Sequence, residues 1–287
     1  MYDIKKRPLG IYEKALPNDF TWLEKMQAAK QAGFDYIEIS VDESDERLAR
    51  LDWSDEQIEE IRSYMKETGI IIPSMCLSGH RRFPFGSKNK EIRDKAFEIM
   101  EKGIILAQKL GVRVIQLATY DVYYEESTFE TKKRFLANLK KAADMAAKAG
   151  VTMGFETMEN EFMNTVEKAM KYVTLVGSPY LNVYPDIGNI TNAAKTYEND
   201  VLEDLELGKG HIVAMHLKET VPGKFREIPF GTGHVDFESA VTKAWELGVR
   251  KYVTEFWYTG NPGWKEDLTF ANEMFTRISV SYTHLRA

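Results

Sequence analysis

The sequence is poor in the features that mark several classes of protein. It has one cysteine, Cys76, among 287 residues, so no disulfide forms within the chain, and a reducing compartment is expected. No apolar run approaches the roughly 20 residues that a membrane-spanning helix requires. The basic start of the chain has no apolar segment behind it, so no signal peptide is expected either. These features together predict a cytoplasmic protein.

The chain also lacks an excess of positive charge. Its 38 basic and 44 acidic residues give a net charge of -6, whereas nucleic acids and membrane surfaces attract proteins with a positive field. We therefore expect neither nucleic acid nor a membrane as a partner. The composition of 44% hydrophobic and 29% charged residues excludes a disordered chain, a collagen-like repeat and a disulfide-rich miniprotein, and it predicts a large core.

Short apolar runs rich in β-branched residues alternate along the chain with longer stretches of helical period, which is typical of repeated βα units. The runs are apolar throughout, as expected for parallel strands that are covered on both faces. Eight strands are predicted: Leu9 to Glu13, Phe34 to Val41, Ile70 to Leu77, Val112 to Ala118, Val151 to Thr157, Leu181 to Ile187, Ile212 to Lys218 and Tyr252 to Trp257.

The stretches between these runs have apolar residues every three or four positions, the spacing of an amphipathic helix. The clearest predicted helices are Trp22 to Ala32, Ser54 to Glu67, Lys90 to Leu110 and Thr131 to Ala149. A glycine lies between each of these helices and the next predicted strand, where it adopts a left-handed conformation at little cost. Eight βα units without a linker-like break favour one α/β domain, a (β/α)8 TIM barrel, over an open doubly wound sheet.

The predicted barrel covers residues 1–278. The end of the chain, from Ser279 to Ala287, breaks the helical period expected of the last helix. We interpret residues 279–287 as an atypical C-terminal tail and leave them out of the functional argument.

Polar side chains of the metal-binding type stand near the ends of four successive predicted strands. They are Glu156, Asp186, His216 and Glu255, the strand-end quartet. Barrel enzymes build their sites at the carboxyl ends of the strands, and three carboxylates brought together there repel one another unless a cation lies between them. A salt bridge or a core histidine would explain each residue singly, but the set predicts a divalent metal site. Oxygen ligands with one imidazole suit Mn²⁺, Mg²⁺ or Co²⁺, and Zn²⁺ is also compatible.

Four longer segments carry a resemblance to a known family. They are Met75-Cys-Leu-Ser-Gly-His-Arg-Arg-Phe-Pro-Phe-Gly-Ser, Val114-Ile-Gln-Leu-Ala-Thr-Tyr-Asp-Val-Tyr-Tyr, Tyr184-Pro-Asp-Ile-Gly-Asn and His211-Ile-Val-Ala-Met-His-Leu-Lys. The chain resembles the L-xylulose-5-phosphate 3-epimerases, also called L-ribulose-5-phosphate 3-epimerases or hexulose-6-phosphate isomerases. The resemblance extends from Leu9 to about Arg277.

The resemblance implies a xylose-isomerase-like barrel with a divalent metal on Glu156, Asp186, His216 and Glu255. It further implies that Glu156 and Glu255 act as acid and base at C3 and interconvert L-xylulose 5-phosphate and L-ribulose 5-phosphate through an enediolate, a reaction of ascorbate degradation. Free-sugar epimerases of the superfamily carry a histidine three positions after the metal aspartate. This chain has Asn189 there, in agreement with the sugar-phosphate branch.

A phosphorylated sugar also requires cations and N–H donors at a distance from the metal. Two loops that follow predicted strands offer them, and late loops often bind phosphate in barrels. The predicted substrate-binding residues are His80, Arg81, Arg82, Lys218, Glu219, Lys224 and Arg226. Ordinary solvated charges remain the alternative explanation for the arginines and for Lys224.

Three other functions share the same features. A metal-dependent aldose–ketose isomerase would use the same scaffold and would differ only in its product. A DNA-repair endonuclease requires more metal ligands and a basic face, which five histidines and the negative net charge disfavour. A non-catalytic sugar-phosphate-binding barrel would not require two carboxylates opposed across a metal. The sequence leaves the oligomeric state open, a homo-oligomer included.

Overall fold

Eight parallel strands form the centre of the computed structural model, which describes residues 7–284. The strands are β1 (Leu9–Tyr12), β2 (Tyr36–Val41), β3 (Ile71–Leu77), β4 (Val114–Ala118), β5 (Thr152–Glu156), β6 (Leu181–Tyr184), β7 (Met215–Leu217) and β8 (Tyr252–Thr254). Their order in the sheet is β6-β5-β4-β3-β2-β1-β8-β7. Parallel bridges between Val183 and Ile212 and between Asp186 and His216 join β6 to the segment of β7 and complete the barrel.

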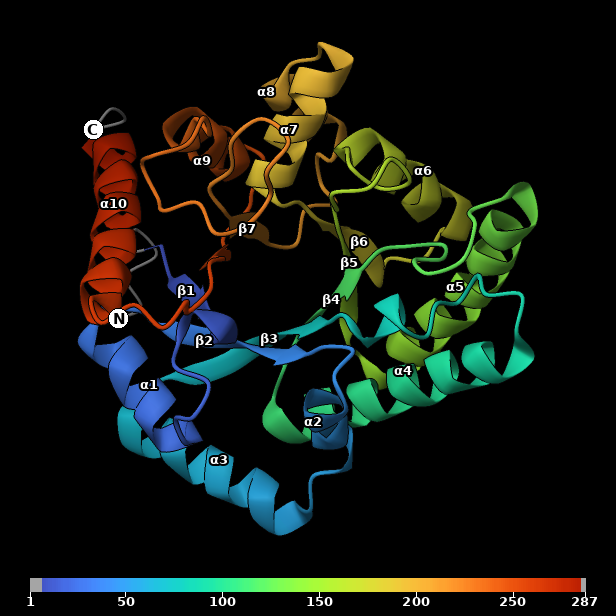
Figure 1. Ribbon diagram of the computed structural model, residues 1–287, viewed down its shortest axis with the longest axis horizontal. Coiled ribbons are helices and arrows are strands. Elements are labelled where there is room, and N and C mark those ends of the chain that lie inside the picture. The colour runs from blue at the N-terminus through green and yellow to red at the C-terminus, as the bar shows by residue number, and fades with distance from the viewer. Residues whose placement is uncertain (1–6, 285–287) are drawn as a thin grey trace.

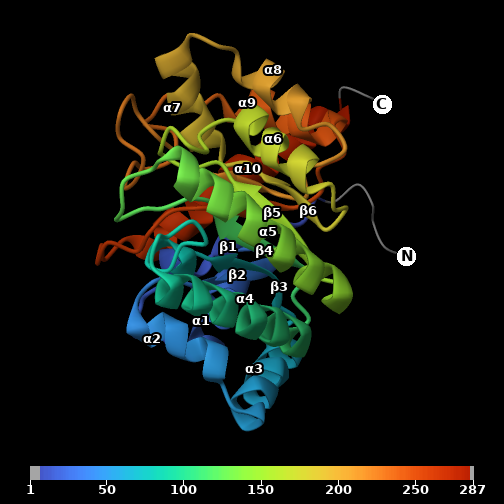
Figure 2. The same ribbon diagram turned by 90° about the vertical axis from the view of Figure 1, so that its right-hand side faces the viewer.

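Helices surround the strands in chain order, as Figure 1 shows from one side and Figure 2 after a quarter turn. They are α1 (Trp22–Gln31), α2 (Asp45–Leu48), α3 (Asp55–Thr68), α4 (Lys90–Leu110), α5 (Phe129–Ala149), α6 (Val166–Val176), α7 (Ile187–Tyr197), α8 (Val201–Leu207), α9 (Phe237–Glu246) and α10 (Trp264–His284). Short 3-10 turns are η1 (Glu13–Ala15), η2 (Ala49–Asp52) and η3 (Gly79–Arg81). The predicted single-domain (β/α)8 barrel is confirmed.

Local signals in the sequence explain where the helices begin and end. Thr21 and Glu24 form a reciprocal capping box at the start of α1, which satisfies backbone N–H groups that have no partner within the helix. At the other end of α3 and α4, Gly69 and Gly111 have φ angles of 78° and 80°, a left-handed conformation that costs other residues more. The prediction that these glycines end the helices is therefore confirmed.

The predicted strands extend up to three residues too far at their carboxyl ends. β6 ends at Tyr184 rather than Ile187, and β8 ends at Thr254 rather than Trp257. The chain leaves β6 at Pro185, and Asp186 then caps helix α7. Two members of the strand-end quartet, Asp186 and Glu255, therefore lie just beyond the ends of β6 and β8.

Helix α10 continues beyond residue 278, where the atypical tail is predicted to begin, and its backbone is helical to His284. Residues 285–287 lie outside the described residues. The boundary between the barrel and the tail stays a prediction. In the part of the chain that the structure describes, no helix has both the length and the apolar character of a membrane span.

Candidate metal and catalytic site

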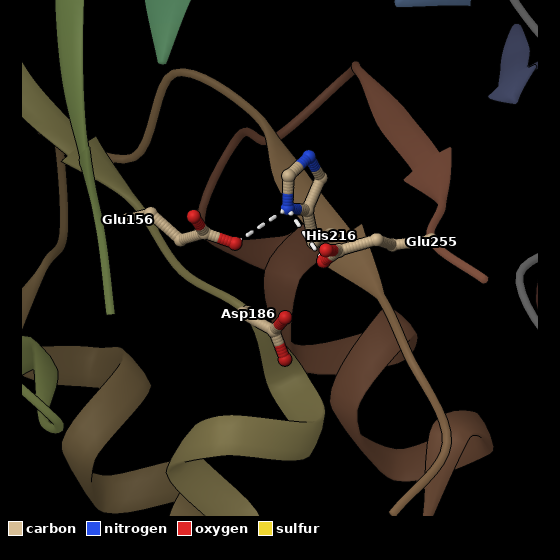
Figure 3. Close-up of side chains that lie close together, drawn as sticks. All are labelled: Glu156, Asp186, His216 and Glu255. Carbon is tan, nitrogen blue, oxygen red and sulfur yellow. Dashed lines mark hydrogen bonds and ion pairs between the residues drawn. The ribbon is translucent and has the colours of Figure 1, made fainter. Parts of the chain in front are cut away.

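The strand-end quartet comes together at the carboxyl end of the barrel (Figure 3). Glu156 is the last residue of β5 and His216 is the middle residue of β7. The strand register brings the four to one level: Asp186 forms a parallel bridge with His216, and Glu255 N–H donates to Leu217 O at 2.8 Å. All four side chains belong to residues that are at most 7% exposed.

The potential ligand atoms of the quartet lie within 4.8 Å of one another. His216 Nδ1 is 2.9 Å from Glu156 Oε1 and 3.0 Å from Glu255 Oε2. Figure 3 shows these two carboxylates approaching the imidazole from opposite sides, with Asp186 below them. Lys218 supplies a counter-ion, since its Nζ is 2.5 Å from Asp186 Oδ2 and 3.8 Å from Glu255 Oε2.

Neighbouring groups fix the orientation of the carboxylates. Gln116 on β4 donates a short hydrogen bond from its amide to Glu156 Oε2. Asp186 Oδ1 accepts the N–H of Asn189 at 2.8 Å as the N-cap of α7, so its other oxygen faces the quartet. Gly188 is required in this turn because a Cβ there would lie 2.7 Å from the backbone oxygen of Lys218. Asp186 therefore has two roles: one oxygen caps helix α7, and the other is directed toward the quartet.

The electrostatics of the quartet fit a divalent cation. Burial raises the pKa of Glu156, and the nearby Glu255 carboxylate raises it further. Burial also raises the pKa of Glu255, but Lys218 and His216 outweigh it and hold that pKa below its ordinary value. Three buried carboxylates here face one ammonium and one imidazole. A site with this excess of oxygen ligands and one imidazole has the donor set of a divalent metal centre.

A cavity of about 630 Å³ opens above the quartet. Glu156, Glu255, Cys76 and Trp257 are among the residues that line it. The cationic side chains along its wall are Lys14, Arg81, Lys218, Lys224 and Arg226. Carboxylates at the metal position and cations around them suit a substrate that has both hydroxyl or carbonyl oxygens and an anionic end.

Comparison with known proteins agrees with this site. A family model described as the xylose isomerase-like TIM barrel matches residues 26–274. The L-ribulose-5-phosphate 3-epimerase UlaE of Escherichia coli O157:H7 is 50% identical over 254 residues, 88% of each chain. The protein of the same name from Salmonella choleraesuis (strain SC-B67) has the same identity and coverage. This chain belongs to the L-ribulose-5-phosphate 3-epimerase family. The resemblance predicted from the four sequence segments is confirmed.

Solved structures share the fold of this epimerase-family chain. A D-psicose 3-epimerase determined in the presence of D-fructose has a TM-score of 0.79 at 17% identity, covering 95% of this chain and 99% of that one. An L-ribulose 3-epimerase has a TM-score of 0.74 at 19% identity, with 98% of each chain covered. At such low identity these likenesses support the barrel architecture alone.

Four of the seven predicted substrate-binding residues line the cavity, namely Arg81, Lys218, Lys224 and Arg226. Lys224 and Arg226 are exposed, and the Arg226 guanidinium lies 5.4 Å from the Trp257 ring centre. Arg81 is half-buried and donates to Tyr120 Oη at 3.1 Å. Their assignment to the substrate stays a prediction.

The other three predicted residues have different contacts. His80 is buried, with Nε2 3.1 Å from Ala96 O and its ring stacked on Phe85. Arg82 is exposed and pairs with Asp45 at 2.7 Å. Glu219 is buried and accepts backbone N–H groups of the loop after β7, including Gly231 N–H at 3.0 Å. None of the three is among the residues that line the cavity, and their contacts fit structural roles.

Two buried polar residues behind the quartet were missed by the sequence reasoning. Glu38 on β2 contacts His216, and Gln116 on β4 holds Glu156. Both interrupt apolar strands, which is the signal that identified the quartet. Both lie in the middle of their strands, whereas the pattern of barrel enzymes predicts functional residues at the strand ends.

Proposed function

We propose that this protein is a metal-dependent 3-epimerase that interconverts L-ribulose 5-phosphate and L-xylulose 5-phosphate. The observation that carries the proposal is the strand-end quartet, with Glu156 and Glu255 on opposite sides of His216 Nδ1. The 50% identity to L-ribulose-5-phosphate 3-epimerases supports the choice of substrate. Glu156, Asp186, His216 and Glu255 would hold the ion, for which Mn²⁺, Mg²⁺, Co²⁺ and Zn²⁺ are the candidates.

The two glutamates carry the proton transfers in this proposal. A divalent ion in the quartet would polarise the C2 carbonyl and stabilise the negative charge of the enediolate. One glutamate then removes the C3 proton, and the other returns a proton to the opposite face, which inverts C3. In the reverse direction the two glutamates exchange these roles. Asp186 and His216 orient the site without moving the C3 proton.

The phosphate end of the substrate is assigned to the cationic wall of the cavity. Arg81, Lys218, Lys224 and Arg226 line the same cavity as Glu156 and Glu255. Arg81 is the strongest candidate because its guanidinium is partly held already, 5.0 Å from the Tyr123 ring centre and hydrogen-bonded to Tyr120. A side chain that is ordered before binding loses less conformational entropy when it meets an anion.

Incubation with L-ribulose 5-phosphate in deuterated water tests the proposal. NMR of the product should identify L-xylulose 5-phosphate with deuterium at C3, because the proton that is returned comes from solvent-exchanged carboxyl groups. An aldose phosphate with label at C1 or C2 would replace epimerisation with the aldose–ketose isomerase function. Binding of the sugar phosphate without any exchange would favour the non-catalytic barrel.

The same incubation with the variants Glu156→Gln and Glu255→Gln distinguishes the roles of the two glutamates. Each variant should lose epimerisation and yet exchange the C3 proton of one epimer with solvent, a different epimer in each variant, since the remaining carboxylate faces one side of C3. Metal content is measured in the same samples. A cytoplasmic location stays a prediction for this protein, and its oligomeric state stays open.

A further inference from the structure

The two ring nitrogens of His216 have different surroundings. Nδ1 faces Glu156 and Glu255 at 2.9 and 3.0 Å. Nε2 lies on the far side of the ring from these carboxylates (Figure 3) and is 2.6 Å from Glu38 Oε1. Only one of the two nitrogens therefore faces the position at which the quartet would hold a cation.

Glu38 is a fully buried carboxylate on β2 that reaches His216 on β7 across the inside of the barrel. Its second oxygen, Oε2, accepts the hydroxyl hydrogen of Tyr184 at 2.8 Å. Tyr184 is itself fully buried, and its ring centre lies 4.7 Å from that of His216. When Glu38 is a carboxylate, both of its oxygens are acceptors, and the proton shared with Nε2 then belongs to the imidazole.

No ordinary salt bridge explains the carboxylate at this position. Within residues 7–284, the ion pairs of Glu38 include no lysine or arginine, and His216 is its partner. A buried carboxylate is costly unless its charge is compensated. The compensation here passes through the imidazole, whose other nitrogen faces the cation position.

We propose that Glu38, oriented by Tyr184, is the positioning residue that keeps the proton on Nε2 of His216 and directs the Nδ1 lone pair to the metal. The inference rests on the proposed metal role of the quartet. Glu38 touches neither the substrate nor the metal. It acts by fixing the tautomer and ring angle of one ligand and by making that ligand more basic, an effect worth 10- to 100-fold in metal affinity at comparable sites.

Titration of the metal-free protein with Co²⁺, followed by visible absorption, measures this effect without the enzymatic reaction. Glu38→Gln keeps an acceptor for Nε2 but loses the charge, so the Kd should rise about 10-fold. Glu38→Ala loses acceptor and charge together, and the expected rise is about 100-fold. Tyr184→Phe keeps the carboxylate and frees its second oxygen, so its effect should be the smallest of the three.

Asp204→Asn is the matched control. Asp204 is another buried carboxylate, on α8 of the outer helical layer, where it accepts the N–H groups of Val166 and Glu167 at 2.8 and 3.0 Å. The same carboxylate-to-amide change there should lower stability and leave the Co²⁺ Kd unchanged. An equal loss of affinity in Asp204→Asn and Glu38→Gln would mean general destabilisation and would overturn the proposal.

The Nε2 proton gives a second, spectroscopic test. In the Co²⁺ protein, the imidazole N–H should appear as a paramagnetically shifted, slowly exchanging proton signal, because Glu38 accepts it in a buried position. The signal should be lost in Glu38→Ala. Wild-type affinity in both Glu38 variants would refute the positioning role. A wild-type protein that binds no divalent metal would instead refute the proposed metal site, so the two failures are distinguishable.

Discussion

Two buried clusters of charge lie at the carboxyl ends of the strands of this barrel, and their balance of charges is opposite. In the Glu13 cluster, one carboxylate meets three cations: Lys25 at 2.9 Å, Arg47 at 2.9 Å and Arg50 at 2.6 Å. In the strand-end quartet, three carboxylates meet one imidazole, with Lys218 as the nearby ammonium. Both clusters are almost inaccessible to water.

The two clusters differ in their balance of charges. Burial raises the pKa of Glu13, but Arg50, Lys25 and Arg47 outweigh it and hold that pKa well below its ordinary value. In the quartet, burial and Glu255 raise the pKa of Glu156. In the Glu13 cluster, cations of the protein outnumber the single carboxylate. In the quartet, carboxylates outnumber the single imidazole, and one ammonium lies nearby. Such a surplus is tolerated where a cation binds.

The largest expected effect comes from removing a quartet ligand. His216→Ala and Asp186→Ala should each lose most of the bound metal and at least about a thousandfold in activity, since the electrophilic stabilisation of the enediolate depends on the ion. The Asp186→Ala barrel should stay folded because Asp186 lies beyond the end of β6. His216→Ala should also lose stability because it leaves the buried Glu38 carboxylate without its partner. Metal analysis of the purified variants, with circular dichroism, checks this. Full metal occupancy with full activity in both would end the assignment.

A change in the Glu13 cluster should lower the stability of the fold rather than the amount of bound metal. Glu13→Gln leaves three buried cations without their carboxylate, so the free energy of unfolding should fall by about 3–5 kcal/mol. Metal bound per folded molecule should not change. Denaturant unfolding measures the loss, and Glu59→Gln, the same change in an exposed pair with Arg62, should cost less than about 1 kcal/mol.

The difference in unfolding free energy between wild type and Glu13→Gln should depend on pH, and its direction follows from the pKa of Glu13. The pKa of Glu13 is lower in the folded protein than its ordinary value of 4.5. Its stabilising contribution is therefore complete above about pH 4.5 and is lost as the pH falls toward the folded-state value. The gap between wild type and Glu13→Gln should narrow below about pH 4.5. A gap that widens in acid would contradict the ion-pair explanation.

A smaller effect is expected at the cavity wall, where two adjacent arginines form a matched pair. Arg81 lines the cavity, whereas Arg82 pairs with Asp45 at the surface. Arg81→Ala should raise KM for the phosphorylated ketose by about 10- to 100-fold, the loss of one charge-assisted contact, and should affect the free ketose less. Arg82→Ala should leave both KM values nearly unchanged. Steady-state kinetics on both sugars decides it, and equal behaviour of the two variants would remove Arg81 from the phosphate site.

The smallest expected effect concerns His80. This buried residue belongs to neither cluster and, unlike them, has no charged partner. Burial lowers its pKa to about 4 from 6.5. Because the unfolded chain takes up a proton first, the stability due to neutral His80 is present above about pH 6.5 and is lost as the pH falls toward 4. Between pH 7 and pH 5 this costs about 2 kcal/mol. His80→Gln should lack this part of the pH slope when both proteins are unfolded in urea with chelator present, and an identical slope would contradict the assignment.

The sequence was informative about elements because their signals are local. A left-handed glycine after a helix, as at Gly69 and Gly111, depends on the backbone of a few residues. The strand ends were less well predicted, since Pro185 and the cap at Asp186 stop β6 before its apolar run ends. Hydrophobic pattern indicates what is buried, but not where the last ladder hydrogen bond forms.

The barrel and the quartet as a set were predictable from the amino-acid sequence, because eight βα units leave few topologies and carboxylates in apolar strands are costly without a partner. The family followed from the resemblance of four segments, which begin at Met75, Val114, Tyr184 and His211. Which polar residues meet depends on the folded barrel. It separated Arg81 from Arg82, turned His80 into a core residue, and brought Glu38 from β2 to His216 on β7. Glu38 and His216 are 178 residues apart in the sequence. Their contact follows from barrel closure and strand register, which no local pattern encodes.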